Sequence, residues 1–488
     1  MLSLNRTELI AQGAWIAGKA VGASESRTFT VYNPANGSLI ATLPDCGAAE
    51  AEAAISAAHE AFLSWRKLLA KERADFLKAW YAVLKKNQED LARLISLEQG
   101  KPLTESRGEV AYGAAYVEWF AEEARRAYGD IIPEPAHGRK ILVTKEPVGV
   151  AAAITPWNFP IAMLARKIAP ALAAGCTIVA KPAEDTPLSA LAIAMLASEA
   201  GIPAGVINVV PASRERAATV VDQWLGDTRV RKLSFTGSTA VGKHLAQSSA
   251  ATLKRLSLEL GGNAPFIVFE DADLDAAVKG VIASKFRNAG QTCVCANRIY
   301  VADTIYERFA EMLVEAISHL RVGPADTEEV EIGPLINAKA LEKVERHVSD
   351  AVQHGARVLI GGKRHALGRY FFEPTVLVGA TSAMAVACEE TFGPVAPLFR
   401  FHSEDEVIAG ANATPFGLVA YFYSRDLARI HRVAAALEAG MIGVNEGIIS
   451  TEVAPFGGVK ESGYGREGSQ YGIDEYLQTK YICLGGLG

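Results

Sequence analysis

From Gly149 onward, short apolar runs alternate with helical patterns, and this alternation limits the fold more than any other feature of the chain. Four runs typical of buried strands, VGVAAAIT, CTIVAKP, GVINVVP and VRKLSFTG, cover residues 148–155, 176–182, 205–211 and 230–237. Helical patterns at 162–175 and 186–201 separate the first three runs. Strands that alternate with helices predict a parallel sheet with helices on both faces.

The same alternation restarts after Glu259 and predicts a second α/β unit. Strand-like runs at 264–271 and 298–303 are followed by helical patterns at 272–290 and 305–320. Residues 47–128, ahead of the first unit, have apolar side chains at helical spacing. A chain of 488 residues is too long for one compact core, so two or three domains are expected.

Two segments fit neither unit. Residues 129–149 have alternating apolar side chains on either side of Pro133, Pro135 and Gly138, which predicts a long hairpin. The C-terminal run IDEYLQTKYICLGG, residues 473–486, is strand-like. A protruding hairpin and a terminal strand offer free edges that can pair with another subunit, so a homo-oligomer is expected.

Charge and cysteine usage argue against several classes of protein. The formal net charge of −6 and the pI near 5.9 give no reason to expect nucleic acid or an anionic membrane as partner. The apolar stretch at 148–165 contains Pro156 and Pro160, which would break a lone membrane-spanning helix. The 6 cysteines are scattered, without a CxxC pair, so we expect reduced thiols, a cytoplasmic location and no metal site.

Two residues are candidates for catalysis on local pattern alone. Cys293 ends the segment NAGQTC, which predicts a loop after a helix, where amide N–H groups favour the thiolate. An inert buried thiol is the commoner role of a single cysteine. Glu259 lies in the apolar run LSLELGGNAP, where desolvation would raise its pKa and suit a general base. A solvent-facing glutamate at a strand end is an equal alternative.

A third pattern favours a phosphate site. The strand within KLSFTGSTAVGK reaches Gly237, after which Ser238 and Thr239 predict a helix start with free N–H groups. The pattern is neither GxGxxG nor a Walker sequence, so it is weak by itself. WNFP and KPAED end two other strands of the same predicted sheet. Ligands of such sheets bind beyond the carboxyl ends of the strands.

Seven segments occur in the order that the aldehyde dehydrogenase superfamily has them: TPWNFP, KPAEDTP, FTGSTAVG, LELGGNAP, GQTC, EETFGPV and PFGGVKESGYGREG. The chain resembles that superfamily from about Asn33 to its C-terminus. The resemblance implies an α/β fold with two doubly wound α/β domains, for cofactor and catalysis, plus a small β oligomerisation domain. The implied bounds are 1–127 with 148–260 for the NAD(P)-binding domain, 261–465 for the catalytic domain, and 128–147 with 466–488 for oligomerisation.

The resemblance also implies a mechanism. Cys293 matches the nucleophile, Asn158 the oxyanion-stabilising amide, and Glu259 the base that activates water to release the acid from a thioester. The residues that match contacts to NAD or NADP are Thr155, Pro156, Trp157, Lys181, Glu184, Gly237, Ser238, Glu390 and Phe392. Because a carboxylate at Glu184 would repel the 2′-phosphate of NADP, NAD is the expected preference, with NADP possible.

Two arginines and a serine indicate the substrate. Arg287 lies shortly before the nucleophile and Arg166 lies on the helix after WNFP. Two guanidinium groups in one tunnel would repel unless an anion such as a substrate carboxylate lies between them; a surface charge is the plain alternative for each. Together with Ser450, they match the pattern of succinate-semialdehyde dehydrogenases. Cys295 matches a cysteine that forms a reversible disulfide with the nucleophile in some members.

The expected reaction is therefore the NAD(P)-dependent oxidation of succinate semialdehyde to succinate. Glutarate semialdehyde, one methylene longer, stays open because a methylene changes binding by only ~1–3 kcal/mol. A CoA-acylating enzyme is less favoured, because Glu259 is present to activate water. A catalytically silent relative with a structural role is the alternative from a different class, and the presence of Cys293, Glu259 and Asn158 together argues against it.

Overall fold

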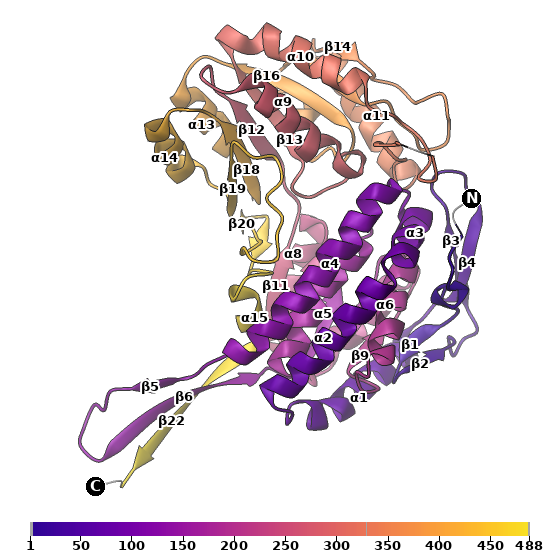
Figure 1. The fold of residues 1–488 in the computed structure, drawn as a ribbon, viewed down its shortest axis with the longest axis vertical. Coiled ribbons are helices and arrows are strands. Elements are labelled where there is room, and N and C mark those ends of the chain that lie inside the picture. The colour runs from indigo at the N-terminus through magenta and orange to yellow at the C-terminus, as the bar shows by residue number, and fades with distance from the viewer. Residues whose placement is uncertain (1–2, 328, 487–488) are drawn as a thin grey trace.

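The computed structural model describes residues 3–327 and 329–486. The purple-to-pink lobe in Figure 1 is built on an eight-stranded sheet in the order β2-β1-β9-β8-β7-β10-β11-β21. Neighbouring strands from β9 to β11 are parallel, as the strand–helix alternation predicted. The strands are β1 (Ala14–Ile16), β2 (Lys19–Val21), β7 (Val150–Ile154), β8 (Thr177–Lys181), β9 (Ile207–Val209), β10 (Val230–Thr236), β11 (Arg255–Glu259) and β21 (Gly463–Tyr464).

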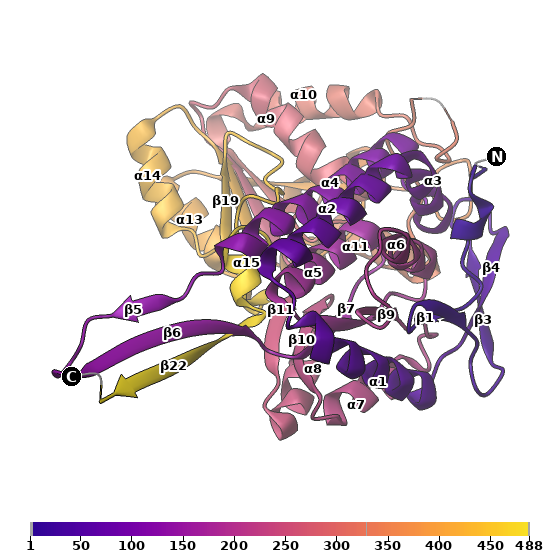
Figure 2. The same cartoon turned by 60° about the horizontal axis from the view of Figure 1, so that its bottom comes forward.

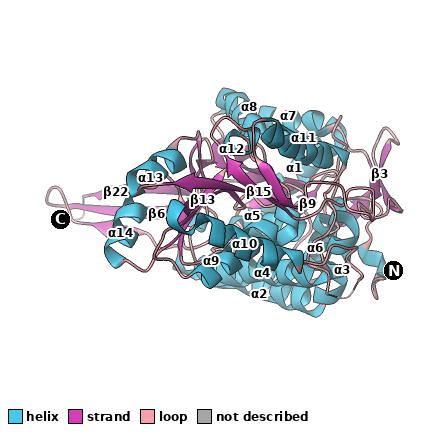
Figure 3. Cartoon of the chain, turned by 90° about the horizontal axis from the view of Figure 1, so that it is seen from above, coloured by secondary structure: helices cyan, strands magenta, loops and turns pink. Residues whose placement is uncertain are grey.

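Helices cover both faces of this sheet (Figure 3). Successive side chains of a strand point to opposite faces. Ala151 and Ala153 of β7 accordingly belong to the core on the side of α2, α4, α5 and α6, whereas Val150 and Ala152 pack with α1, α7 and α8. The helices are α1 (Ala48–Trp65), α2 (Ala70–Lys86), α3 (Gln88–Gln99), α4 (Leu103–Glu123), α5 (Pro160–Ala174), α6 (Pro187–Glu199), α7 (Ala217–Gly226) and α8 (Thr239–Ser249).

The second α/β unit contains a seven-stranded sheet in the order β14-β15-β16-β13-β12-β18-β19. All neighbours are parallel except the β14–β15 pair. Its strands are β12 (Ala264–Val268), β13 (Ala296–Ala302), β14 (Arg357–Ile360), β15 (Thr375–Ala380), β16 (Val395–Phe401), β18 (Val419–Tyr423) and β19 (Met441–Val444). Its helices are α9 (Leu274–Val281), α10 (Tyr306–Ser318), α11 (Ala338–Gln353), α12 (Ala385–Cys388), α13 (Glu404–Asn412) and α14 (Leu427–Ala436).

The predicted hairpin and C-terminal strand form one three-stranded sheet that projects from the body as an arm (Figures 1 and 2). β5 (Asp130–Ile132) and β22 (Leu477–Gly485) flank β6 (Arg139–Pro147), and both pairs are antiparallel. Ile131 and Tyr481 on this arm are 81% and 61% exposed, which is unusual for large apolar side chains and typical of an interaction surface.

Besides short 3-10 and π-helical turns, two small ladders and one short α-helix complete the described elements. They are β3 (Thr28–Tyr32) with β4 (Leu39–Pro44), β17 (Phe416–Gly417) with β20 (Val459–Lys460), and α15 (Tyr471–Asp474). The domain bounds implied by the sequence stay a prediction. β21 lies within the range 261–465 that was expected for the catalytic domain, but it pairs with β11 in the first sheet. Among the described residues, no helix is long and apolar enough to cross a membrane.

Candidate active site

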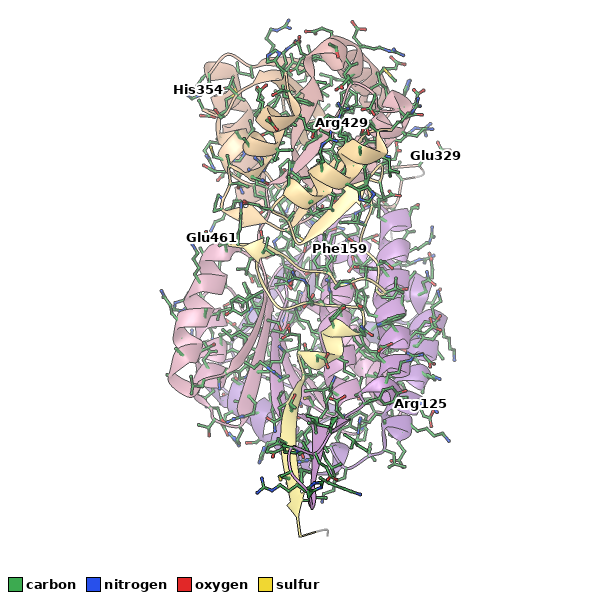
Figure 4. All side chains as sticks on the ribbon, turned by 90° about the vertical axis from the view of Figure 1, so that its left-hand side faces the viewer. Arg125, Phe159, Glu329, His354, Arg429 and Glu461 are labelled. Atoms are coloured by element: carbon green, nitrogen blue, oxygen red, sulfur yellow. The ribbon has the colours of Figure 1, made fainter. Side chains whose placement is uncertain are left out.

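The chain passes from the first sheet to the second where three parallel strands end. β7 ends at Ile154 and β10 at Thr236, and β11 ends at Glu259, from which Leu260–Asn263 lead directly into β12. Parallel strands that end together open a crevice beyond their carboxyl ends. Phe159, which follows β7, marks the junction of the two lobes in Figure 4.

Two cavities meet at Cys293, whose side chain lines both. One has a volume of about 330 Å³ and lies against the strand ends, and we name it the strand-end cavity. The other has a volume of about 250 Å³ and contains two arginines, and we name it the arginine cavity. A nucleophile between two cavities can face a cofactor on one side and a substrate on the other.

The strand-end cavity has the features that a dinucleotide needs. Ser238 lines the cavity and is the N-cap of α8, its Oγ accepting a hydrogen bond from Val241 N at 3.5 Å, so the N-terminus of that helix lies beside the cavity. Trp157 and Phe392 meet edge to face at 5.5 Å and form an apolar wall for a flat ring. Of the residues expected at the cofactor, the lining contains Pro156, Trp157, Gly237, Ser238, Glu390 and Phe392.

The turn at Gly237 has no room for a side chain, because a Cβ there would lie 2.4 Å from the Phe235 ring. Burial raises the pKa of Glu390, also in the lining, to about 7, against the opposing charge of Lys343. Both Lys343 and Arg214 line the cavity, and sequence reasoning missed them. Cations, helix N–H groups and apolar plates together fit NAD or NADP, and the bound nicotinamide would supply a hydride acceptor.

Thr155, Lys181 and Glu184 lie outside the lining of the strand-end cavity. Glu184 is connected to it through Arg214, whose Nε donates to Glu184 Oε1 at 2.7 Å. Burial would raise the pKa of Glu184, but the charges of Lys181 and Arg214 outweigh it, and the pKa falls. A 2′-phosphate would therefore meet Arg214 as well as the carboxylate. The preference for NAD that was expected from Glu184 stays a prediction.

The arginine cavity brings together residues that are far apart in the sequence. The expected substrate residues Arg166, Arg287 and Ser450 all line it, together with Cys293. The remaining lining residues are Glu105, Gly108, Glu109, Tyr112, Phe159, Met163, Thr292, Val294 and Phe456.

The two arginines differ in how their charge is balanced. Arg166 is 1% exposed, and its Nε lies 2.5 Å from Glu467 Oε2. Its guanidinium also stacks over the Phe456 ring at 4.0 Å. Arg287 packs over Phe159 at 5.3 Å, and its Nε has no hydrogen-bond partner among the described residues. Glu467 thus places a carboxylate beside Arg166, which it shares with Lys167, and the substrate-binding role of the two arginines stays a prediction.

Glu259 is a buried carboxyl in a cluster of charges. It is 3% exposed, and neither carboxyl oxygen has a hydrogen-bond partner among the described residues. Burial, and next the like charge of Glu467, raise its pKa well above the usual range, against the charges of Arg166 and Lys167. The sequence predicted that desolvation would raise the pKa of Glu259, and this direction is confirmed. Lys167 holds Glu467 in place and donates to Thr236 Oγ1 at 2.7 Å.

The thiol of Cys293 differs from the expectation of a low pKa. Burial raises its pKa to about 12, and the negative charges of Glu390 and Glu259 add to this against Arg166. A thiol with a raised pKa has to lose its proton before the sulfur can act as a nucleophile.

Cys295 lies at the end of a turn, in which its N donates to Thr292 O at 3.1 Å. Its Sγ lies 3.3 Å from Lys285 Nζ in the protein interior. Burial raises its pKa, although Lys285 opposes the shift. Both thiols are free, and the reversible disulfide stays a prediction.

Asn158 is held through one side of its amide, while its Oδ1 has no hydrogen-bond partner among the described residues. Its Nδ2 donates to Gln291 O at 3.0 Å in the loop before Cys293, and its side chain lines the strand-end cavity beside that cysteine. An amide carries two N–H groups, so one remains for an oxygen on the reacting carbon.

Sequence reasoning missed the carboxylates and the lysine that balance these charges: Glu105, Glu109, Lys167 and Glu467. Glu467 could have been singled out, since it lies in the quoted segment GYGREG, but its pairing with Arg166 spans most of the chain. Tertiary pairings of that kind leave no local pattern.

Comparison with known proteins identifies the family. The model of the "Aldehyde dehydrogenase family" matches residues 21–482. The chain is 60% identical over 487 residues to 3-sulfolactaldehyde dehydrogenase of Pseudomonas putida, covering 100% of both chains. It is 57% identical to the NADP(+) succinate-semialdehyde dehydrogenase of Escherichia coli (strain K12), covering 99% of this chain and 100% of that one. It is 56% identical to glutarate-semialdehyde dehydrogenase of Pseudomonas aeruginosa, covering 100% of both.

Solved structures agree with this result. The crystal structure of an E. coli NADP dependent enzyme matches with a TM-score of 0.98 at 57% identity, covering 99% of this chain and 100% of that one. A P. syringae indole-3-acetaldehyde dehydrogenase variant in complex with NAD+ matches with a TM-score of 0.95 at 37% identity, covering 98% and 97%. The cofactor is NAD or NADP. The family model and these relatives match nearly the whole chain, including both α/β units and the arm. The protein is an enzyme, and the chain belongs to the aldehyde dehydrogenase family.

Proposed function

We propose that the enzyme oxidises a short aldehyde with an anionic group at its far end, succinate semialdehyde foremost. One observation carries this proposal: Arg287, whose Nε has no hydrogen-bond partner among the described residues, lines the same cavity as Cys293. A guanidinium binds a carboxylate through two parallel hydrogen bonds, which fixes its orientation as well as its charge. Ser450, in the same lining, supplies a further hydroxyl.

The proposed chemistry uses the residues at the junction of the two cavities. The Cys293 thiol gives up its proton to water, the sulfur attacks the aldehyde carbon, and Asn158 stabilises the oxyanion of the resulting thiohemiacetal. A nicotinamide held in the strand-end cavity would accept the hydride from that carbon, which leaves a thioester on Cys293. Glu259 then takes a proton from water, which attacks the resulting thioester and releases the acid. Its raised pKa suits this step, because a base near the pH of operation accepts a proton most effectively.

Glutarate semialdehyde is the alternative with one more methylene, and relatives at 56–57% identity are named for each of the two semialdehydes. 3-Sulfolactaldehyde is a second candidate, because the relative at 60% identity is named for it and a sulfonate is also an anion that Arg287 can bind. We further propose that both NAD and NADP are used, since Arg214 balances Glu184. A homo-oligomer assembled through the arm and a cytoplasmic location complete the proposal.

The test is a panel of kcat/KM values measured with both cofactors. It contains succinate semialdehyde, glutarate semialdehyde, 3-sulfolactaldehyde and uncharged butanal. We expect each anionic aldehyde to exceed butanal, with succinate semialdehyde highest. Butanal as good as the anionic substrates would refute the proposal, and a clear maximum at another anion would replace the substrate while keeping the role of Arg287.

A further inference from the structure

Three charged side chains at the arginine cavity, the buried Lys101 and Glu109 and the half-buried Glu105, have no part in the proposed chemistry. Lys101, Glu105 and Glu109 lie just before α4 or on its first two turns, and we name them the α4 brace. The side chains of Lys101 and Glu109 are fully buried, with Nζ and Oε2 2.6 Å apart. A buried ion pair often stabilises a fold no better than apolar residues of the same size. The other contacts of the brace therefore indicate what it does.

Lys101 holds the backbone of Asn158. Its Nζ donates to Asn158 O at 2.7 Å and lies 3.8 Å above the Phe159 ring. Asn288 Nδ2 donates to the same carbonyl at 3.1 Å. The peptide that carries the proposed oxyanion amide is thus fixed by two donors, one of them charged, and charged donors make the stronger hydrogen bonds.

Glu109 and Glu105 fix the two segments on either side. Glu109 Oε1 accepts from Ile161 N at 2.9 Å and from Ala162 N at 3.3 Å, in the first turn of the helix that follows Asn158. Glu105 accepts from Asn288 N at 2.9 and 3.1 Å.

Asn288 and Ala289 have φ angles of 51° and 54°, a left-handed conformation that side chains disfavour. Glu105 therefore holds a strained turn just before Cys293. Through the brace, α4 connects the oxyanion side of the site to the nucleophile side.

We propose that Lys101 is a positioning residue: through the α4 brace it keeps the Asn158 amide aimed at the oxygen of the reacting carbonyl. Lys101 touches neither substrate nor the reacting sulfur, and acts through the Asn158 carbonyl. The inference rests on the proposed role of Asn158 as the oxyanion donor.

The experiment is a double-mutant cycle with Lys101→Met and Asn158→Ala, read as kcat/KM for succinate semialdehyde. Removal of one oxyanion donor lowers the rate by ~10²–10³-fold in other enzymes. We expect a loss in that range for Asn158→Ala and about a tenfold to hundredfold loss for Lys101→Met. In the Asn158→Ala background, Lys101→Met should cost less than about threefold, since residues that act through one another are not additive.

Lys254→Met is the matched control. Lys254 is also buried, and its Nζ donates to two backbone carbonyls, Asp227 O and Val230 O, each at 2.7 Å, away from Asn158. We expect it to lower the melting temperature as Lys101→Met does while leaving kcat/KM near that of wild type. Should Lys101→Met fail to fold, Lys101→Gln with Glu109→Gln removes both charges together and enters the same cycle.

The inference would be overturned if Lys101→Met lowered kcat/KM by the same factor in the wild-type and Asn158→Ala backgrounds. It would also be overturned if Lys254→Met lowered kcat/KM as much as Lys101→Met does. If Asn158→Ala alone leaves kcat/KM unchanged, the proposed oxyanion role fails, and the positioning role falls with it. If Asn158→Ala lowers kcat/KM but the effects of the two substitutions are additive, only the positioning role of Lys101 is overturned.

Discussion

The two cavities that meet at Cys293 are built in different ways. The strand-end cavity presents mainly the ends of strands, the N-terminus of α8 and an apolar wall of Trp157 and Phe392. The arginine cavity is walled by charged side chains, Glu105, Glu109, Arg166 and Arg287, with Glu467 paired behind Arg166. The first therefore depends on the fold, and the second on particular side chains whose charges must balance.

This difference has a consequence for how substitutions act. A change of an uncharged side chain in the strand-end cavity leaves the backbone N–H groups in place, so cofactor binding should tolerate it. Loss of Arg166 in the arginine cavity removes a charge whose partner, Glu467, remains buried, and this destabilises strongly unless the partner is also removed. The predictions below separate these two behaviours.

The largest effect is expected at the residue that both cavities share. Cys293→Ala should remove turnover, by about a millionfold if it parallels the loss of a catalytic serine. Binding of NAD should persist, because the strand-end cavity keeps its other lining residues. Stopped-flow NADH formation and fluorescence titration with NAD measure the two. Retained turnover would rule out the covalent role, and lost NAD binding would mean that the two cavities are not independent.

The next effect distinguishes the two arginines. Arg287→Ala should raise KM for succinate semialdehyde and hardly change that for butanal, because it removes a charge-assisted hydrogen bond worth about 1.5–3 kcal/mol, or roughly tenfold to over a hundredfold. Arg287→Lys keeps the positive charge but loses the two parallel N–H donors of the guanidinium, so its KM for succinate semialdehyde should lie between those of wild type and Arg287→Ala.

Arg166→Ala should behave differently, since it leaves Glu467 buried beside Glu259. We expect it to lower the melting temperature and to reduce activity on both aldehydes alike. A loss confined to the charged aldehyde would instead assign Arg166 to substrate binding, as the sequence alone suggested.

The sequence predicted one half of this comparison better than the other. The parallel strands, the helix start at Ser238 and the crevice beyond the strand ends all follow from local periodicity and capping, so the strand-end cavity was predictable. Periodicity also gave the hairpin and the C-terminal strand that form the arm.

The charge balance of the arginine cavity was not predictable. In this cavity Arg166 pairs with Glu467; outside it, the Glu184–Arg214 pair and the contact of Cys295 with Lys285 were equally unpredicted. Each pairing is made by the tertiary fold and has no sequence spacing of its own. The low pKa expected for Cys293 was wrong because it, too, depends on the tertiary fold. Burial and two nearby carboxylates raise the pKa and oppose the effect of any N–H groups in the loop.

A smaller effect concerns pH. The pKa of Glu259 is raised, so its basic form grows as the pH rises, and the hydrolysis of the thioester should speed up with pH through that raised pKa. Glu467→Gln removes the like charge and frees Arg166 and Lys167 to favour the carboxylate. The pKa of Glu259 should therefore fall, and the rise in kcat should move to lower pH.

The measurement is kcat against pH for wild type and Glu467→Gln, each normalised to the fraction of folded enzyme. Glu461→Gln, an exposed acid paired with Lys243, is the control for loss of one carboxylate. A profile that stays in place, or moves to higher pH, would show that Glu467 does not set the pKa of the base.

Cofactor choice should respond more weakly still. Arg214→Ala removes the cation beside Glu184 and should lower kcat/KM with NADP by about tenfold, the effect of one lost charge-assisted contact. With NAD the change should be small, because a ribose hydroxyl can still donate to Glu184. The ratio of kcat/KM for the two cofactors measures this directly. Equal losses with both would place Arg214 in general cofactor binding.

The smallest expected effect concerns Cys295. Its Sγ contacts Lys285 Nζ, and the pKa of both thiols is raised, so few thiolates are available to peroxide near neutral pH. Closing a disulfide with Cys293 also requires Cys295 to leave its contact with Lys285. We therefore expect slow inactivation by peroxide, most of it reversed by dithiothreitol, and a faster onset as the pH rises. In Cys295→Ala the loss should become irreversible, because no second thiol captures the sulfenic acid formed at Cys293. Cys388→Ala, which removes an exposed cysteine, is the control and should resemble wild type. If Cys295→Ala recovers as fully as wild type, Cys295 only packs beneath the loop, and the arginine cavity contains no redox switch.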